Sequence, residues 1–412
     1  MRNARAWFLS VISVLLITCS LSITPILSHN TQSRIIQSRG EIAPPAPQLR
    51  VNGLYLEDGS GNRVRLKGIQ VDWNQRMKKQ GTLSGASFPE ESWFTIEDVG
   101  RMKEAGANCV EIVVIGTPEL MPTRNVTSET FFSNWVDKWV SWATQHELYI
   151  ILNIRGMGAS AQWWIDLSIP KWLWQGLYPQ PTTRAEYDAV IRDFFDLNVA
   201  KQDVNREAFI NLWKFIANRY KNNPYVVFSI MNEPFNQVEI PNEATAIHLG
   251  LTYSTYMERI VDAIRSTGAQ QLVFIDHPFL MDSKLKWTDH PVNRDNIVWE
   301  AHNYVTPTRD FNYWKSQIDS LFQKYVNEFG KPLFIGEYGF DPIKQTVRET
   351  YPTTWETILS NQVSYLDNLQ IAGRQWHQWG YIDGECYDYE GTSDFTAEES
   401  EWIIQTTLGG QF

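Results

Sequence analysis

Residues 226–234 read VVFSIMNEP, a stretch in which an apolar run ends in Asn232, Glu233 and Pro234. Near-continuous apolar runs of this length are typical of parallel strands that are buried on both faces. Seven more short runs recur along the chain, each followed by a longer amphipathic stretch. The predicted strands are Val64–Val71, Asn108–Ile115, Leu148–Ile154, Val226–Asn232, Gln271–Asp276, Ile297–His302, Pro332–Glu337 and Arg374–Trp379.

The segments between these strands have the pattern of helices. Acidic residues follow Thr95 in a first helical turn, and Gly106 and Gly268 fall where helices end. Eight strand–helix units in about 360 residues predict a single (β/α)8 barrel, an α/β fold. A doubly wound sheet is the alternative, but the glycine-rich turn that normally follows its first strand is absent from the sequence. The predicted helical segments include Thr95–Ala105, Glu129–Gln145, Arg206–Tyr220, Ala244–Ser266, Phe311–Phe329 and Trp355–Leu369.

The N-terminal part of the chain precedes this repeat. An uncharged apolar stretch follows Arg2 and Arg5, so residues 1–29 are either a secretory signal or an N-terminal membrane anchor. Residues 30–48 contain a proline-rich run and predict a linker to a barrel domain at 49–412. We expect that domain to lie outside the cytoplasm, secreted or membrane-anchored. The runs 49–56 and 64–73 flank turn residues and predict a hairpin at its start.

The composition excludes several classes of protein. Hydrophobic residues make up 43% of the 412 and charged residues 20%, which predicts a packed body rather than a disordered chain. A net charge of −11 repels polyphosphates, so we expect no nucleic-acid partner. Cys109 and Cys386 are predicted at opposite ends of the barrel, which favours free thiols. Metal-ligand spacing is absent from the sequence, so we expect no metal or cofactor, and we expect a monomer.

Two predicted strands end in a glutamate, the fourth in Glu233 and the seventh in Glu337. Active sites of (β/α)8 barrels lie at the carboxyl ends of the strands. A lone glutamate there is usually a solvated loop residue, but a pair suggests chemistry. Two carboxyl groups can divide the roles of acid and nucleophile in glycoside hydrolysis, about 5–5.5 Å apart in a retaining enzyme.

With these residues the sequence resembles glycoside hydrolase family 5, the cellulase-type retaining glycosidases, over roughly residues 49–408. The hairpin region 54–69 is similar to the family's opening, and Asn232-Glu233-Pro234 matches its most specific motif. The resemblance implies that Glu233 is the acid/base and Glu337 the nucleophile. Asn232 can hydrogen-bond a sugar 2-hydroxyl, an interaction that strengthens in the transition state.

The resemblance extends to residues that contact substrate. His302-Asn303-Tyr304 matches the family's His-x-Tyr, in which Tyr304 would hold Glu337 for attack. Trp379 is the preferred candidate for the tryptophan that stacks under the sugar, ahead of Trp376. Further candidates for substrate contacts are Trp73 and Asn74 after the first strand and Asp276 and His277 after the fifth.

Two positions depart from the family. Glu111 stands where the family usually carries an arginine on strand two, and Arg155 stands where it usually carries a histidine after strand three. The family's arginine keeps the nucleophile ionised. We therefore hypothesise that Arg155 supplies this positive charge and binds substrate, with Glu111 as its partner, because a buried charge needs one.

The predicted function is retaining hydrolysis of β-glycosidic bonds in a plant-type polysaccharide. A β-1,4-glucan, as for an endoglucanase, or a β-mannan, as for a mannanase, is the favoured substrate. Two alternatives stay open: a glycan-binding barrel without catalysis, and a transglycosylase that uses the same residues.

Overall fold

The computed structural model describes residues 47–71, 95–115, 128–155, 177–179, 181–235, 238–278, 290–306, 308–340, 354–377 and 397–409. The elements below all belong to one unit of the chain, Ala43–Phe412. Trp73, Asn74, Trp379, Cys386 and the predicted signal or anchor lie outside the described residues. Within the described residues, none of the helices is both long and apolar enough to cross a membrane.

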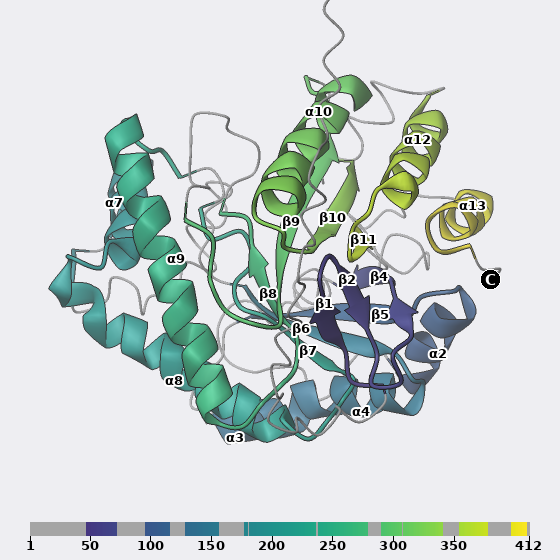
Figure 1. Ribbon diagram of the computed structural model, residues 1–412, viewed down its shortest axis with the longest axis horizontal. Helices are drawn as coiled ribbons and strands as arrows, with labels where there is room; N and C mark the ends of the chain where they lie inside the picture. Colours follow the sequence, from purple (N-terminus) through teal and green to yellow (C-terminus); the bar gives the residue numbers. More distant parts are fainter. Residues whose placement is uncertain are drawn as a thin grey trace, which may run out of the picture. The chain divides into compact units, whose positions relative to one another are not determined.

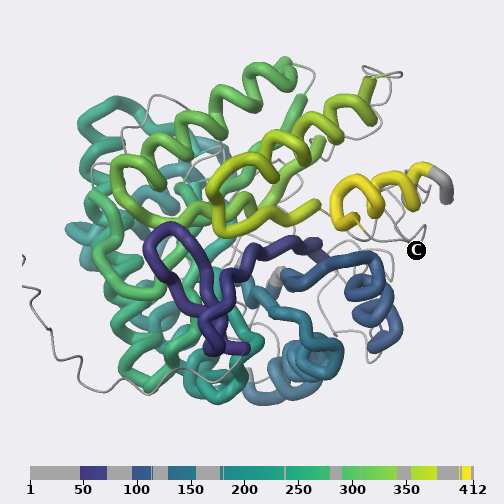
Figure 2. The backbone as a smooth tube through the Cα atoms, turned by 45° about the vertical axis from the view of Figure 1, so that its right-hand side comes forward, coloured from purple at the N-terminus to yellow at the C-terminus, as the bar shows by residue number. Residues whose placement is uncertain are grey.

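In the described part of the chain, eight parallel strands close a barrel in the order β10-β11-β4-β5-β6-β7-β8-β9 (Figure 1). The barrel strands that come first and last along the chain, β4 and β11, lie side by side, since Gly373 of β11 pairs with Leu66 of β4. Figure 2 shows β4 in purple beside β11 in yellow-green. The bounds are β4 Leu66–Val71, β5 Cys109–Ile115, β6 Tyr149–Arg155, β7 Val226–Ser229, β8 Val273–Asp276, β9 Ile297–Val305, β10 Leu333–Phe340 and β11 Gly373–His377. The prediction of a (β/α)8 barrel is confirmed.

Helices surround the barrel (Figure 1). All six predicted helical segments are present, two of them with a π-helical portion, and α7 and α13 were not predicted. Their bounds are α2 Ile96–Glu104, α3 Ser128–Phe131, η2 Phe132–Val136, α4 Asp137–Gln145, α7 Arg184–Phe195, η3 Ala200–Gln202, α8 Asp203–Tyr220, α9 Glu243–Ser266, α10 Phe311–Phe322, η5 Gln323–Glu328, α12 Trp355–Asn368 and α13 Ala397–Leu408.

Helix α7 begins at a signal that the sequence carries. Thr183 accepts the backbone N–H of Glu186, and the Glu186 side chain reaches back to the Thr183 backbone. This reciprocal capping satisfies two N–H groups that the first helical turn leaves without partners. The pattern Thr-x-x-Glu before an apolar periodicity is therefore the signal by which this unpredicted helix could have been found.

The predicted hairpin is in fact a three-stranded antiparallel sheet, β1 Arg50–Asn52, β2 Tyr55–Glu57 and β3 Arg63–Val64. The run 49–56 contains a second turn at Gly53, whose φ of +61° suits glycine. The predicted turn is present after β2, where Asp58 Oδ1 accepts the backbone N–H groups of Ser60 and Asn62. The second predicted strand therefore divides into β3 and the barrel strand β4.

An apolar cluster fills the barrel near the amino ends of its strands. It contains Leu49, Leu56, Cys109, Ile151, Val227, Phe274, Val298 and Phe334. Leu56 comes from the small sheet, so that sheet contributes directly to the barrel interior. Cys109 is a free, buried thiol, and burial raises its pKa. A second, larger cluster lies between the strands and the helices.

Above this apolar cluster the barrel interior becomes polar. Two residues further along their strands come Glu111, Asn153, Ser229, Asp276 and Glu300, all of them buried. Side chains at i and i+2 share one face of a strand, so these groups lie directly between the apolar cluster and the carboxyl ends of the strands. The apolar cluster therefore forms the floor of a buried polar layer.

The substitution Leu56→Ala tests how much the apolar cluster at the floor of the barrel contributes to stability. Truncating this fully buried side chain should lower the free energy of unfolding by about 2–5 kcal/mol through lost burial and the cavity left behind. Leu251 on α9 is 45% exposed, so Leu251→Ala is the matched control, with an expected change within about 0.5 kcal/mol. Urea unfolding measures both; equal effects would show that Leu56 is not part of the core.

Candidate active site

Glu233 stands in a turn that follows β7, and its backbone is held in place by a neighbouring strand. Its φ of +44° lies in the left-handed region, which is costly for a residue other than glycine, of order 1–3 kcal/mol. The Oδ2 atom of buried Asp276, at the end of β8, accepts the Glu233 backbone N–H at 2.6 Å. Asp276 therefore stabilises the conformation that directs Glu233.

Glu337 lies inside β10, at an irregularity in the strand register that falls between Ile335 and Glu337. A Cβ at Gly336 would lie 2.1 Å from a Glu300 carboxylate oxygen, so only glycine fits beside that buried acid. Irregularities of this kind change the direction of a side chain, and here the redirected residue is Glu337.

Hydrogen-bond donors reach both oxygens of the Glu337 carboxyl group. Gln70 Nε2, at the end of β4, donates to Oε1 at 2.7 Å, and the Tyr304 hydroxyl donates to Oε2. Glu337 is 3% exposed and Gln70 is fully buried. Donors on both oxygens stabilise the ionised form of a carboxyl group.

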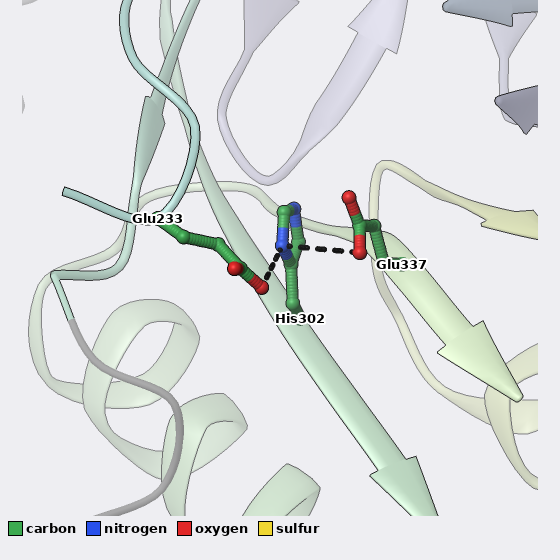
Figure 3. A group of neighbouring side chains, drawn as sticks. All are labelled: Glu233, His302 and Glu337. Carbon is green, nitrogen blue, oxygen red and sulfur yellow. Dashed lines mark hydrogen bonds and ion pairs between the residues drawn. The ribbon is translucent and has the colours of Figure 1, made fainter. Parts of the chain in front are cut away.

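His302 lies between the two glutamates, as Figure 3 shows. Its Nδ1 is 2.9 Å from Glu233 Oε1 and 3.6 Å from Glu337 Oε2. Its Nε2 is 3.9 Å from both Asp276 Oδ2 and Glu300 Oε1. Burial by itself would lower the pKa of His302, but these carboxyl groups, Asp276 foremost, raise it well above the usual value.

The two carboxyl groups are close together. One ligating atom each from Glu233, His302 and Glu337 lie within 4.8 Å of one another. The same donors could in principle surround a metal ion, but each already has a described protein partner. The arrangement suits two carboxyl groups that act on one bond from opposite sides.

Glu111 is fully buried below Glu233 and Glu337. Its described partners are amides and not the arginine, Arg155, with which an ion pair was hypothesised. Its carboxyl group accepts hydrogen bonds from the side-chain amides of Gln70, Asn153 and Gln375. In the sheet register Glu111 pairs with Ile151, four residues before Arg155, which corresponds to about 13 Å along the strand. The side chain of Arg155 lies outside the described residues. The register therefore argues against the proposed partnership.

Burial changes the protonation of Glu111. Burial raises its pKa to about 8, with a further contribution from Glu300 and a smaller one from Glu337, against the lowering effect of the amides of Gln70 and Gln375. A carboxyl group in this state is neutral over most of the mildly acidic range. It differs in kind from the permanently charged arginine that the family usually carries at this position.

The remaining predicted residues have different locations. Asn232 accepts a hydrogen bond from Asn153, and the hydroxyl of Tyr304 donates to Glu337. Asn232 and Tyr304 are therefore part of the site. His277 is half-buried, with Nδ1 on the hydroxyl of Tyr325, a core residue, and burial lowers its pKa to about 4. Its predicted substrate contact stays a prediction. Trp376 is buried edge-to-face against Tyr338 and is a core residue.

Gln70 is a site residue that the sequence did not suggest, and Asp276, a predicted substrate contact, has a different role in the structure. Gln70 contacts Glu337, and Asp276 holds the backbone of Glu233. The signal that could have revealed Gln70 is a polar side chain near the end of an otherwise apolar parallel strand. Asp276 carries the same signal at the end of β8.

A (β/α)8 barrel with a glutamate pair at the carboxyl ends of its fourth and seventh strands defines a class, the barrel glycoside hydrolases. The family model "Cellulase (glycosyl hydrolase family 5)" matches residues 59–381. The chain therefore belongs to glycosyl hydrolase family 5 and is a glycoside hydrolase. The family expected from the sequence is confirmed.

The similar proteins found are distant in sequence. Endoglucanase A of Paenibacillus barcinonensis is 25% identical over 335 residues, 77% of this chain and 72% of that protein. Endoglucanase Z of Dickeya dadantii (strain 3937) is 25% identical over 206 residues, 49% of this chain and 43% of that protein. Among solved structures, endo-glycoceramidase II from Rhodococcus sp. superposes with a TM-score of 0.61 at 19% identity, over 85% of this chain and 80% of that one. A broad-specificity endoglucanase from an uncultured bacterium gives 0.58 at 17%, over 83% and 94%.

The raised pKa of Glu111 predicts a pH dependence of stability. Between pH 4.5 and about 8 the unfolded chain has lost the Glu111 proton while the folded chain retains it. Because the folded state then binds more protons, the free energy of unfolding falls as the pH rises through this window. Glu111→Gln removes this titration, so its unfolding free energy should fall less than that of the wild type. Urea unfolding across the window measures it, and equal slopes would contradict the burial of an acid here.

Proposed function

We propose that the protein hydrolyses β-glycosidic bonds with retention of configuration, through a covalent intermediate on Glu337. The observation that carries this proposal is the spacing of Glu233 and Glu337, since one carboxyl oxygen of each lies within 4.8 Å of the other. Retaining enzymes hold their carboxyl groups about 5–5.5 Å apart, whereas inverting enzymes need about 6.5–9.5 Å to admit a water molecule. The spacing favours direct attack on the sugar.

The surroundings of the two glutamates support different roles. Glu337 is buried and receives hydrogen bonds on both oxygens, from Gln70 and Tyr304, which suits an ionised nucleophile held in one orientation. Glu233 is more exposed and bonds His302. Glu233 then protonates the leaving oxygen while Glu337 attacks the anomeric carbon, and Glu233 afterwards activates the water that releases the sugar.

Asn232 supports sugar binding next to the bond that breaks. Its Oδ1 accepts a hydrogen bond from Asn153 Nδ2 at 3.3 Å, so the Asn232 amide nitrogen is left to donate elsewhere. A donor at this position suits the 2-hydroxyl oxygen of the sugar, where a hydrogen bond strengthens as the transition state forms.

The proposed substrate is a β-1,4-glucan, with β-mannan as the second candidate. Two relatives within the family are named endoglucanases, which supports a glucan. Trp73, Trp379, Arg155 and His277 stay proposals as substrate contacts. The basic and apolar N-terminus at 1–29 supports a location outside the cytoplasm, either secreted or anchored.

A substrate panel tests the proposed function. Reducing-sugar release would be measured on carboxymethyl cellulose, barley β-glucan, glucomannan, galactomannan, xyloglucan and xylan, with a glycosylceramide as a further arm. Activity on a β-1,4-glucan that both Glu233→Gln and Glu337→Gln abolish is the expected result. Binding without cleavage would favour the glycan-binding alternative, and longer products at high substrate concentration would favour the transglycosylase.

Azide distinguishes the roles of the two glutamates. With 2,4-dinitrophenyl β-cellobioside, whose leaving group needs no protonation, Glu233→Ala should still form the glycosyl-enzyme and azide should release it as the β-glycosyl azide. Glu337→Ala should give the α-glycosyl azide, because azide then takes the nucleophile's place. Proton NMR of the azide product reads the configuration, and the opposite assignment would exchange the two roles.

A further inference from the structure

Three side-chain amides beneath the active site share one pattern of hydrogen bonds. Those of Gln70, Asn153 and Gln375, from β4, β6 and β11, are each fully buried. Each NH2 group donates to the carboxyl group of Glu111, at 2.9, 3.0 and 2.9 Å. One acidic side chain therefore accepts from three strands of the barrel at once.

Each of these NH2 groups also makes a second hydrogen bond, and each second acceptor belongs to the active site. Gln70 donates to Glu337 Oε1 at 2.7 Å, and Asn153 donates to Asn232 Oδ1 at 3.3 Å. Gln375 donates at 3.0 Å to the backbone carbonyl of Gly336, the residue directly before Glu337. The three amides connect Glu111 to the nucleophile, to its backbone and to the asparagine beside the acid.

The pairing with Glu111 determines which way each amide faces. An amide side chain can turn its oxygen or its nitrogen toward a neighbour. Glu111 Oε1 accepts from both Gln70 and Asn153, and this oxygen stays an acceptor in the neutral acid, where Oε2 carries the proton. Gln70 lies between two carboxyl groups, so its NH2 group, with two N–H donors, is the end that suits both. Without Glu111, the Gln70 oxygen could turn toward Glu337 and repel it.

We propose that Glu111 is a positioning residue, which fixes three amides so that these, rather than an arginine, hold Glu337 and Asn232 in their reactive orientation. This inference rests on the proposed function and identifies how this chain compensates for the family's missing arginine. In this arrangement the nucleophile Glu337 receives a hydrogen bond from the neutral amide of Gln70, and the same amide is held from its other side by Glu111.

Gln70 is fully buried against Glu337, and Glu111 is fully buried against Gln70, so we expect both to affect the chemical step rather than the binding of the sugar. Gln70→Met keeps the length of the side chain and removes the donor to Glu337. Glu111→Gln offers one oxygen and one NH2 group, so at least one of the three amides loses its acceptor. Gln271→Met is the matched control, because this buried amide lies before β8 and donates to the backbone carbonyls of Tyr220 and Asn223.

The experiment measures covalent labelling of the full chain by 2,4-dinitrophenyl 2-deoxy-2-fluoro-β-cellobioside, with the labelled peptide identified by mass spectrometry. The wild type should be labelled at Glu337. Gln70→Met should be labelled about 10- to 100-fold more slowly at saturating probe, with an unchanged half-saturating concentration, because it loses one hydrogen bond to a charged group. Glu111→Gln should also be labelled more slowly, with no loss of stability at pH 8, and Gln271→Met should match the wild type.

Each other outcome has a defined meaning. Labelling of Gln70→Met and Glu111→Gln at the wild-type rate would overturn the positioning role while leaving the proposed function intact. An unlabelled wild type would overturn the proposed function, and the inference with it. If Glu111→Gln does not fold, Gln375→Met removes one branch of the same network, and a wild-type rate in that variant would overturn the role of Glu111 in holding the Glu337 backbone.

Discussion

The imidazole of His302 lies within 4 Å of four carboxyl groups, those of Glu233, Asp276, Glu300 and Glu337, and the rest of the site depends on this arrangement. Charges removed from water are stable only when they are paired or hydrogen-bonded. Inside the barrel the necessary partners come from one imidazole, from side-chain amides, from Tyr304 and from the backbone of Glu233. The acids can stay close together because these partners surround them.

The barrel divides its interior into two levels with different tasks. Near the amino ends of the strands, Phe274, Phe334 and their apolar neighbours contribute burial. Two residues further along, the strands carry a polar level in which Asn153 donates to Glu111 and Ser229 donates to Glu300. The register of the strands sets this second level, so a shift of one strand would separate Gln70 from Glu337. The stability of the floor and the geometry of the site are thus linked through the same eight strands.

The sequence predicts the barrel and the two glutamates because both depend on local patterns: apolar runs of strand length, and an acid where such a run ends. The contacts of Gln70 and Asp276 could not be predicted in this way. Gln70 and Glu337 are 267 residues apart, and their contact depends on closure of the barrel between β11 and β4. The register of strands is likewise not readable from local patterns: Glu111 and Arg155 stand on adjacent strands, but the offset that pairs Glu111 with Ile151 comes only from the structure. The turn that divides the first strand of the predicted hairpin has Gly53, a single glycine with positive φ, as its signal in the sequence.

We propose that Glu233 and Glu337 act by double displacement, because their carboxyl groups lie close together. The most direct measurement is proton NMR of the anomeric signals during the first minutes of β-glucan oligosaccharide cleavage, before the product equilibrates. The account predicts that the β-anomer appears first and the α-anomer grows only as the sugar mutarotates. Initial release of the α-anomer would contradict it, because inversion requires a water molecule between the sugar and the second carboxyl group.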